Sequence, residues 1–399
     1  MNFKKKSIIQ INGMFNKVQC THRTGFVLII ISLCITLLFY SCGKETPGSV
    51  NVTGNNTQEN NLPDATVLID ELHDIYNKLI ENEGYTKNTL LEFEQIEESI
   101  YANPIKYGIY AVSTCYIGYI RNLIEINDRS RIPIVMDRWT ESVEKLCDLT
   151  IDINFDFTNE LLYSVEEFVR LGLYCGTEFD VKSLYLTEKI HAFFEQLKEK
   201  YIQFEFDYYV AKINYSYVLF LNCEFDKSHE LLDQIIQTEY KMLALPVLSY
   251  HYLFNNMVAE AASIYESYAE TINDINQTQD AIDVFKPVLS GIFDDLYQFK
   301  KRQTAVQNID AVLESISFYP VLNIIFIEEE KSEQVGIKLY DKLIKYNGDI
   351  CMSYNHFSEL RRISSDNDTI ELIRDGKIVS IFVPTGKLGI YLEEDIAFK

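Results

Sequence analysis

Thiol and imidazole side chains are the residues of this 399-residue chain that could bind a metal or act as nucleophile and base. The eight cysteines include no pair with the close spacing of zinc ligands, and the histidines are scattered singly. Cys351 and His356 are near neighbours, but a chain with several thiols offers such pairs by chance. We therefore expect buried free thiols, no bound metal and no cofactor. Beyond residue 42, the residues in question are Cys115, Cys147, Cys175, Cys223 and Cys351, with His73, His191, His229, His251 and His356.

Residues 152–156 imitate the start of a calcium-binding loop. Such a loop needs a glycine at its sharp turn and a bidentate glutamate at its end, where this chain has Phe157 and Tyr163. The sequence also lacks a glycine-rich loop that could cradle phosphates and the nucleophile elbow of hydrolases. We therefore expect that the protein is not an enzyme.

Cys42 stands apart from the other cysteines because it follows a secretion signal. Basic residues up to Arg23 precede a nearly uninterrupted apolar run at residues 26–40. As a helix, this run would reach roughly 22 Å, short of the bilayer's hydrocarbon core of about 30 Å. The length indicates a signal peptide over residues 1–41, with an uncleaved anchor helix as the alternative and Met14 as a second possible start. Both readings place the rest of the chain outside the cytoplasm.

The sequence Leu38-Phe39-Tyr40-Ser41-Cys42 resembles the lipobox of bacterial lipoproteins, although its aromatic pair departs from the strictest form. The resemblance implies that Cys42 carries a lipid, with acyl chains such as palmitate, that anchors the protein in the membrane. Gly43 stands where the inner-membrane retention signal has an aspartate, which favours the outer membrane. Lys44-Glu45 is similar to the surface-export signal of some outer-membrane lipoproteins, so display at the cell surface is the implied location.

Residues 42–63 read as the lipidated cysteine and a flexible tether, with a root-mean-square reach of about 25 Å. The formal net charge of the chain is -23. The first 42 residues hold basic side chains and no acidic ones, so the remainder is more negative still. Nucleic acid is therefore excluded as an expected partner, because phosphate binding needs a basic face.

Residues 64–346 repeat amphipathic stretches of helical period between short polar breaks. The first stretch follows Asp64, which we expect to cap a helix. Between Pro133 and Pro246 there is no proline, which suits continuous helix. These patterns predict a mainly α body.

Residues 208–273 resemble two units of the tetratricopeptide repeat, a pair of helices with small residues where the helices cross. The resemblance implies a helix-pair solenoid, and a non-repeating helical bundle is the alternative. The family's closing proline is absent from both units, and Phe168 with Leu171-Gly172 fits only the first helix of a third. The matching positions are Tyr215, Ser216, Leu219, Ser228 and Leu232 in one unit, and Leu245, Leu248, Ser249, Tyr252, Ala261 and Tyr265 in the next.

Residues 347–399 have a different residue pattern from the helical stretches before them, because three apolar segments with the composition of β-strands follow residue 368. Asp375-Gly376 is a tight-turn signal between the first two, so the pattern predicts a small three-stranded β-meander. Three short strands are too few to be stable alone, so we expect a cap packed on the last helices. The expected organisation is thus a signal at 1–41, a tether at 42–63, a helical-repeat-like domain at 64–346 and a cap at 347–399.

Two functions remain open at this point. The first is a membrane-anchored binding or scaffold lipoprotein that presents its helical surface to a protein or peptide partner. The second is a glycan-capture lipoprotein, similar to the helical-repeat partners of outer-membrane nutrient importers. The single Trp139 weakens the second reading, although 27 tyrosines could supply the aromatic faces that bind sugars.

Overall fold

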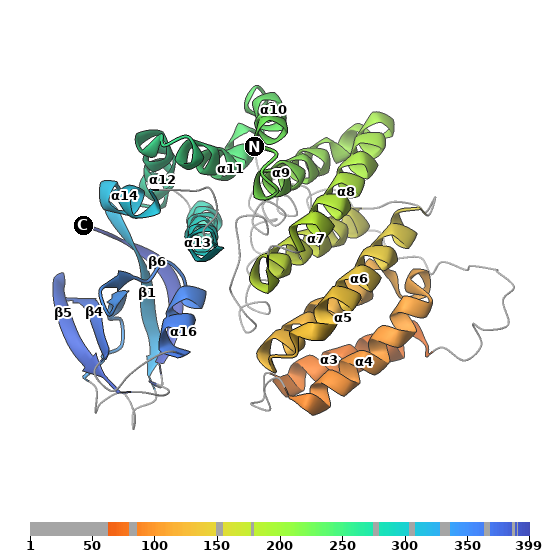
Figure 1. Cartoon of the computed structure of the whole chain (residues 1–399), viewed down its shortest axis with the longest axis horizontal. Coiled ribbons are helices and arrows are strands. Elements are labelled where there is room, and N and C mark those ends of the chain that lie inside the picture. The colour runs from red at the N-terminus through yellow and green to blue at the C-terminus, as the bar shows by residue number, and fades with distance from the viewer. Residues whose placement is uncertain are drawn as a thin grey trace, which may run out of the picture. The chain divides into compact units, whose positions relative to one another are not determined.

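The computed structural model describes residues 63–79, 86–148, 155–176, 179–273, 279–302, 308–327, 336–362, 368–384, 388 and 390–399. The expected signal, Cys42 and the tether as far as residue 62 lie outside these residues, and so do residues 152–154 of the calcium-like segment. The chain divides into two compact units, and along the described body the division falls between Leu231 and Leu232. Helices alone build the first unit, whereas helices and a sheet build the second (Figure 1).

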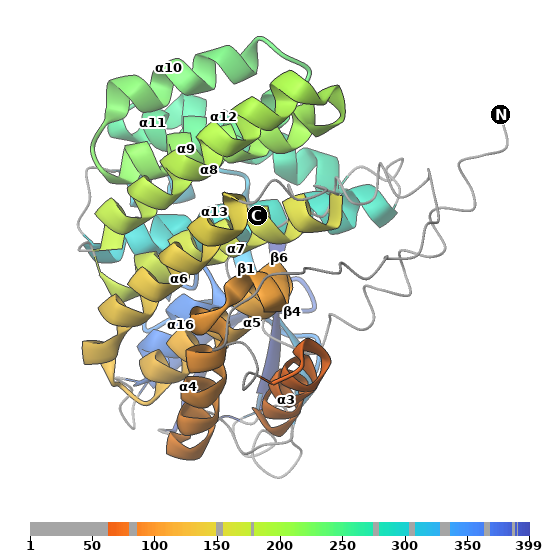
Figure 2. The ribbon, with the colours of Figure 1, turned by 90° about the vertical axis from the view of Figure 1, so that its right-hand side faces the viewer.

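The first unit is an array of helices packed in consecutive order (Figures 1 and 2). Its helices are α3 (Ala65–Lys78), α4 (Lys87–Ala102), α5 (Pro104–Glu125), α6 (Ile132–Cys147), α7 (Phe155–Cys175), α8 (Asp180–Lys200) and α9 (Glu205–Leu221), with short 3-10 turns at Arg129–Arg131 and Ile202–Phe204. From α3 to α9 each helix packs against the next, and those from α3 to α7 also contact the next but one: α5 contacts α3 and α7, α7 contacts α9, and α6 contacts α4 and α8. This order is what stacking of consecutive helix pairs produces. The helix α10 (Phe225–Ile236) contains the division between the units.

Local sequence signals explain where these helices begin. Asp64 caps α3 as expected, because its carboxylate accepts a hydrogen bond from a backbone N–H two residues on, at 2.9 Å. Thr86 and Thr89 form a reciprocal capping box at the start of α4. Asn103 caps α5 directly before Pro104, whose missing N–H costs nothing in the first turn of a helix.

An aromatic stack joins α5, α6 and α7. Trp139 lies parallel to Tyr116 with a ring-centroid distance of 5.8 Å, and edge-on to Phe168 at 5.2 Å. All three side chains are fully buried, and the Trp139 indole donates a hydrogen bond to Ser164 Oγ at 3.0 Å. The only tryptophan of the sequence is thus a core residue, so it is not an exposed platform for a sugar.

Gly118 lets α5 approach its neighbours closely. A Cβ atom at this position would lie 2.4 Å from Phe93 Cζ and 2.7 Å from the hydroxyl oxygen of Tyr76. Any larger residue would force α5 away from α3 and α4. The Tyr76 hydroxyl donates a hydrogen bond across the same contact, to the carbonyl oxygen of Thr114 at 2.9 Å.

In the described part of the second unit, five further helices accompany an antiparallel sheet. The helices are α11 (Lys241–Phe254), α12 (Val258–Asn273), α13 (Gln279–Arg302), α14 (Ile309–Ser315) and α16 (Tyr354–Arg362). The strands are β1 (Phe318–Ile327), β2 (Lys342–Tyr346), β3 (Asp349–Ile350), β4 (Asp368–Arg374), β5 (Lys377–Val383) and β6 (Ile390–Phe398). They lie in the order β5-β4-β2-β1-β6, and β3 pairs with β2. Phe357 and Leu360 of α16 pack on the apolar core of the sheet.

The sheet is larger than the expected meander. Both β1 and β2 lie within residues 64–346, which we expected to be helical. The apolar run of β1 is mostly buried as far as Ile324, whereas Ile325 and Phe326 are exposed, and such a run does not distinguish strand from helix by its period. The β4–β5 hairpin confirms the turn at Asp375-Gly376, where both residues have positive φ angles of 49° and 72°. The third expected strand, β6, pairs with β1 at the opposite edge instead of continuing the hairpin.

Candidate binding sites

The structure brings Ser216 of α9 and Ser228 of α10 together at a helix crossing. The Ser216 hydroxyl donates to the carbonyl oxygen of Ser228 at 3.0 Å, and the Ser228 hydroxyl donates to the carbonyl oxygen of Ser216 at 2.8 Å. Both side chains are fully buried. Small hydroxyl residues therefore let the two backbones approach and satisfy the main-chain groups exposed by the crossing.

The next pair of helices has a similar crossing. Ser249 of α11 shares a hydrogen bond of 3.0 Å with the hydroxyl of Tyr265 of α12. Tyr265 and Ala261 are fully buried, and Leu248 is nearly so. Tyr252 is only half-buried. The structure thus brings Ser249 and Tyr265 together across the two helices.

A third crossing of this kind lies between α7 and α8. A Cβ atom on Gly172 would lie 3.2 Å from the hydroxyl of Ser183, so these small residues also mark a close contact. The sequence indicated Phe168 and Gly172 but gave no partner on the following helix. Ser183 was missed because it follows Gly172 by 11 positions, whereas Ser228 follows Ser216 and Ala261 follows Ser249 by 12.

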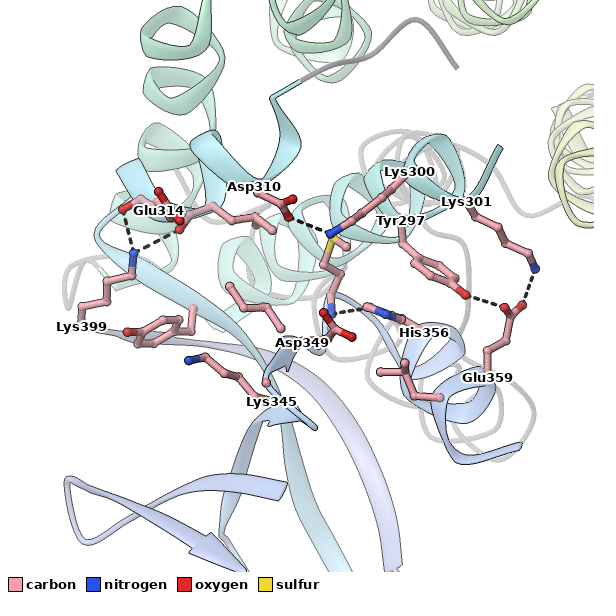
Figure 3. A pocket seen from close by; sticks show the side chains of 16 residues that line it. Tyr297, Lys300, Lys301, Asp310, Glu314, Lys345, Asp349, His356, Glu359 and Lys399 are labelled. Atoms are coloured by element: carbon pink, nitrogen blue, oxygen red, sulfur yellow. Dashed lines mark hydrogen bonds and ion pairs between the residues drawn. The ribbon is translucent and has the colours of Figure 1, made fainter. Parts of the chain in front are cut away.

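A cavity of about 760 Å³ lies in the second unit (Figure 3). Its walls come from α13, α14, α16, the strands β1, β2 and β3, and the last residue of the chain. The charged side chains of the wall are Lys300, Lys301, Lys345 and Lys399 with Asp310, Glu314, Asp349 and Glu359. No local motif joins these positions, which is why the sequence did not indicate the site.

The lysines of this cavity are held by specific partners. Lys300 Nζ lies 2.8 Å from Asp310 Oδ1, and Lys301 Nζ lies 2.6 Å from Glu359 Oε1 (Figure 3). Lys399 Nζ donates to the last carbonyl oxygens of α14 and lies 4.9 Å from the centre of the Tyr319 ring. The wall therefore presents paired charges, which suits hydrogen bonding to a polar ligand better than capture of a strong anion.

His356 lies flat against Tyr297 in the wall of the cavity, with a ring-centroid distance of 4.2 Å and an angle of 16° between the rings. Burial lowers the pKa of His356 to about 4, although Asp349 opposes the shift, so the imidazole is neutral at pH 7. Its Nδ1 accepts a hydrogen bond from the Met352 backbone N–H at 3.4 Å, which leaves the proton on Nε2. The Tyr297 hydroxyl donates to Glu359, and burial raises its pKa, so the phenol stays protonated.

The neighbouring thiol has a different environment. Cys351 is fully buried in the core of the sheet, and burial raises the pKa of its thiol. A protonated thiol in an apolar core is a poor nucleophile. Cys351 and His356 therefore have separate structural roles, in the core and in the cavity wall.

The remaining histidines lie apart from one another. His73 meets the hydroxyl of Tyr110 at 3.0 Å, and His191 stacks on Tyr215 with a ring-centroid distance of 5.4 Å. Within the described ranges, no three Asp, Glu, His or Cys side chains gather into a group that could hold a metal ion. Of the helices that the structure describes, none is both long and apolar enough to cross a membrane.

Together these features define a mainly α protein with consecutive packed helix pairs and a C-terminal antiparallel sheet. No protein-family model, curated protein or solved structure matches the chain.

Proposed function

We propose that the protein is an outer-membrane lipoprotein, anchored through lipid on Cys42, whose tetratricopeptide-like helical body binds a protein or peptide partner. The observation that carries the proposal is the contact of each helix from α3 to α7 with the next but one. Stacking of this kind aligns equivalent helices side by side and so exposes an extended surface for a partner. The crossings at Gly172, Ser216 and Ser249 support a repeating plan for the helix pairs.

The anchor can be tested by metabolic labelling with a fatty-acid analogue. The Cys42→Ser variant should lose the label and keep its signal peptide, because the thioether can form only on the Cys42 sulfur. Cys223→Ser is the matched control, since Cys223 is an exposed free thiol, and this variant should keep the label. Persistent labelling of Cys42→Ser would reject the lipid anchor.

The partner can be sought by affinity capture from solubilised outer membranes. We expect a soluble or envelope protein to co-purify with the helical body. The Ile202 side chain is 76% exposed on the first unit, so Ile202→Glu changes the surface of that unit. Repeating the capture with this variant tests whether the surface takes part in binding the partner. A co-purifying nutrient importer would instead favour glycan capture.

The cavity of the second unit is the observation that favours glycan capture as a second candidate. Carboxylates and ammonium groups in fixed pairs can hydrogen-bond to sugar hydroxyls, and the cavity is of the size that takes a small ligand. Trp139 is buried and gives this candidate no support. Calorimetric titration with a panel of oligosaccharides tests it, with Asp310→Asn as the cavity variant and Glu199→Gln, on the exposed face of α8, as the control.

A further inference from the structure

The two edges of the sheet are built differently. At one edge, β6 carries the acidic run Glu393-Glu394-Asp395 in its middle, and both α13 and α16 contact it. At the other edge, β5 has Lys377 at its start and no charged residue after it. Charged residues and covering helices are the usual means of protecting an edge strand from further pairing. Among the residues that the structure describes, only the β6 edge is protected in this way.

The side chains of β5 are apolar on both faces of the sheet. Ile378 and Phe382 point to one face and are 60% and 75% exposed. Ile381 and Val383 point to the other face, where they belong to the core of the sheet. Ser380 lies at the centre of the strand and is exposed. The strand thus offers unpaired backbone groups between two apolar rows.

We propose that β5 pairs with β5 of a second copy of this chain, antiparallel and related by a two-fold axis at Ser380. In this register Ile378 lies opposite Phe382 of the other copy, and Val379 lies opposite Ile381. Both are cross-strand pairs of the kind that stabilises sheets. The two sheets then form one continuous sheet across the axis.

The charges of β5 fit a second copy better than they fit β6 of another molecule. The register places the two Lys377 side chains at opposite ends of the paired strands, so the like charges stay apart. Pairing of β5 with β6 would set an acidic run against a strand with no cation in its middle. It would also be open-ended, whereas pairing of β5 with itself closes as a dimer. One pair of strands buries little surface, so the dimer depends on protein concentration.

Sedimentation velocity of the full chain in detergent, over a series of protein concentrations, tests the proposal. The parent should pass from one copy to two as concentration rises. Ser380→Lys should remain a single copy, because two ammonium groups would meet at the axis. Ser380 is exposed, so the substitution does not enter the core. Ser263→Lys, on the exposed face of α12, is the matched control and should dimerise like the parent.

Mixing two variants distinguishes a protein that is monomeric because its interface is lost from one that is monomeric because it does not fold. Ser380→Glu should also remain a single copy, but an equimolar mixture with Ser380→Lys should form a mixed dimer through the opposite charges. A parent that stays monomeric at every concentration overturns the proposal. So does a dimer that survives in Ser380→Lys, or a mixture that fails to pair.

Discussion

The first unit joins some of its helices with buried charge, whereas the second joins α11 and α12 with small and aromatic side chains. Glu166 and Glu167 are neighbours on α7, and both are almost fully buried. Glu167 contacts two cations: Arg121 Nη2 lies 3.0 Å from its Oε2, and Arg170 Nε lies 3.0 Å from its Oε1. Glu166 has no such partner, because among the described residues neither of its buried carboxyl oxygens has a hydrogen bond.

The pKa values of these two carboxyls move in opposite directions. Burial raises both, but at Glu167 the two arginines outweigh burial, so the net shift of its pKa is downward. At Glu166 no cation opposes burial, which raises the pKa well above its usual range. Depth of burial alone therefore does not decide whether a carboxyl is charged. The cations beside the carboxyl decide it, here Arg170 on α7 and Arg121 on α5.

At the crossing of α11 and α12 the contact depends on the size of the side chains that fill it. Ala261 and Ser249 are fully buried, and the hydrogen bond between Ser249 and Tyr265 joins uncharged groups. We expect such a contact to respond to added bulk and to be indifferent to pH. The following substitutions test that contrast, and Trp139 serves as a fluorescent reporter for the first unit.

The largest effect should follow from Glu167→Gln. The variant leaves two arginines without their carboxylate in a buried contact, and loss of one partner of a buried ion pair costs about 3–5 kcal/mol. Urea unfolding followed by Trp139 fluorescence at about pH 5 measures the change in free energy of unfolding.

Its matched control is the neighbouring Glu166→Gln. Burial raises the pKa of the Glu166 carboxyl well above its usual range and so favours the neutral form, and an amide of the same shape should change the free energy of unfolding little. Equal losses in the two variants would contradict the assignment of opposite charge states.

The sequence predicted much of this architecture where local signals exist. Asp64 could be identified as a helix cap from its position before an amphipathic stretch, and Asp375-Gly376 as a hairpin turn from its residue types. The pairing of β6 with β1 could not be predicted in this way. It depends on contacts between strands far apart in the chain, for which no local pattern exists.

The candidate sites also differ in whether a local sequence pattern could predict them. The serines at the crossings were visible because the repeat places them at a regular spacing. The cavity wall joins Tyr297 and His356 with Lys399, which only the folded second unit brings together. The charge states of Glu166 and Glu167 were only partly visible, since Arg170 follows Glu167 by three residues but Arg121 comes from α5 and the burial of both carboxyls depends on the fold.

A smaller effect should follow from Ala261→Leu in the second unit. Extra methylene groups at a close helix crossing typically cost about 1–3 kcal/mol. Far-ultraviolet circular dichroism during urea unfolding should show the loss. Ala259→Leu is the matched control, because Ala259 lies on the exposed side of the same helix and should leave stability unchanged. Equal behaviour of the two variants would show that Ala261 is not packed at the crossing.

The smallest effect should be the pH dependence contributed by Asp207 on α9. This carboxyl is buried and hydrogen-bonded by Thr158 of α7, and burial raises its pKa from 3.8 to about 6. Between these values the folded protein keeps a proton that the unfolded chain releases. The stabilisation is therefore complete below about pH 4 and is lost as the pH rises through about 6.

Asp207→Asn should remove this dependence, because an amide does not titrate. We expect the variant to be more stable than the parent by about 1 kcal/mol at neutral pH, less than the roughly 3 kcal/mol that two pKa units represent. The difference arises because the amide replaces only part of the bonding to Thr158. Urea unfolding followed by Trp139 fluorescence across the acid range measures it, with the exposed Asp70→Asn as control. If the parent and Asp207→Asn lose stability in parallel as the pH rises, the contact between α7 and α9 does not hold a protonated carboxyl.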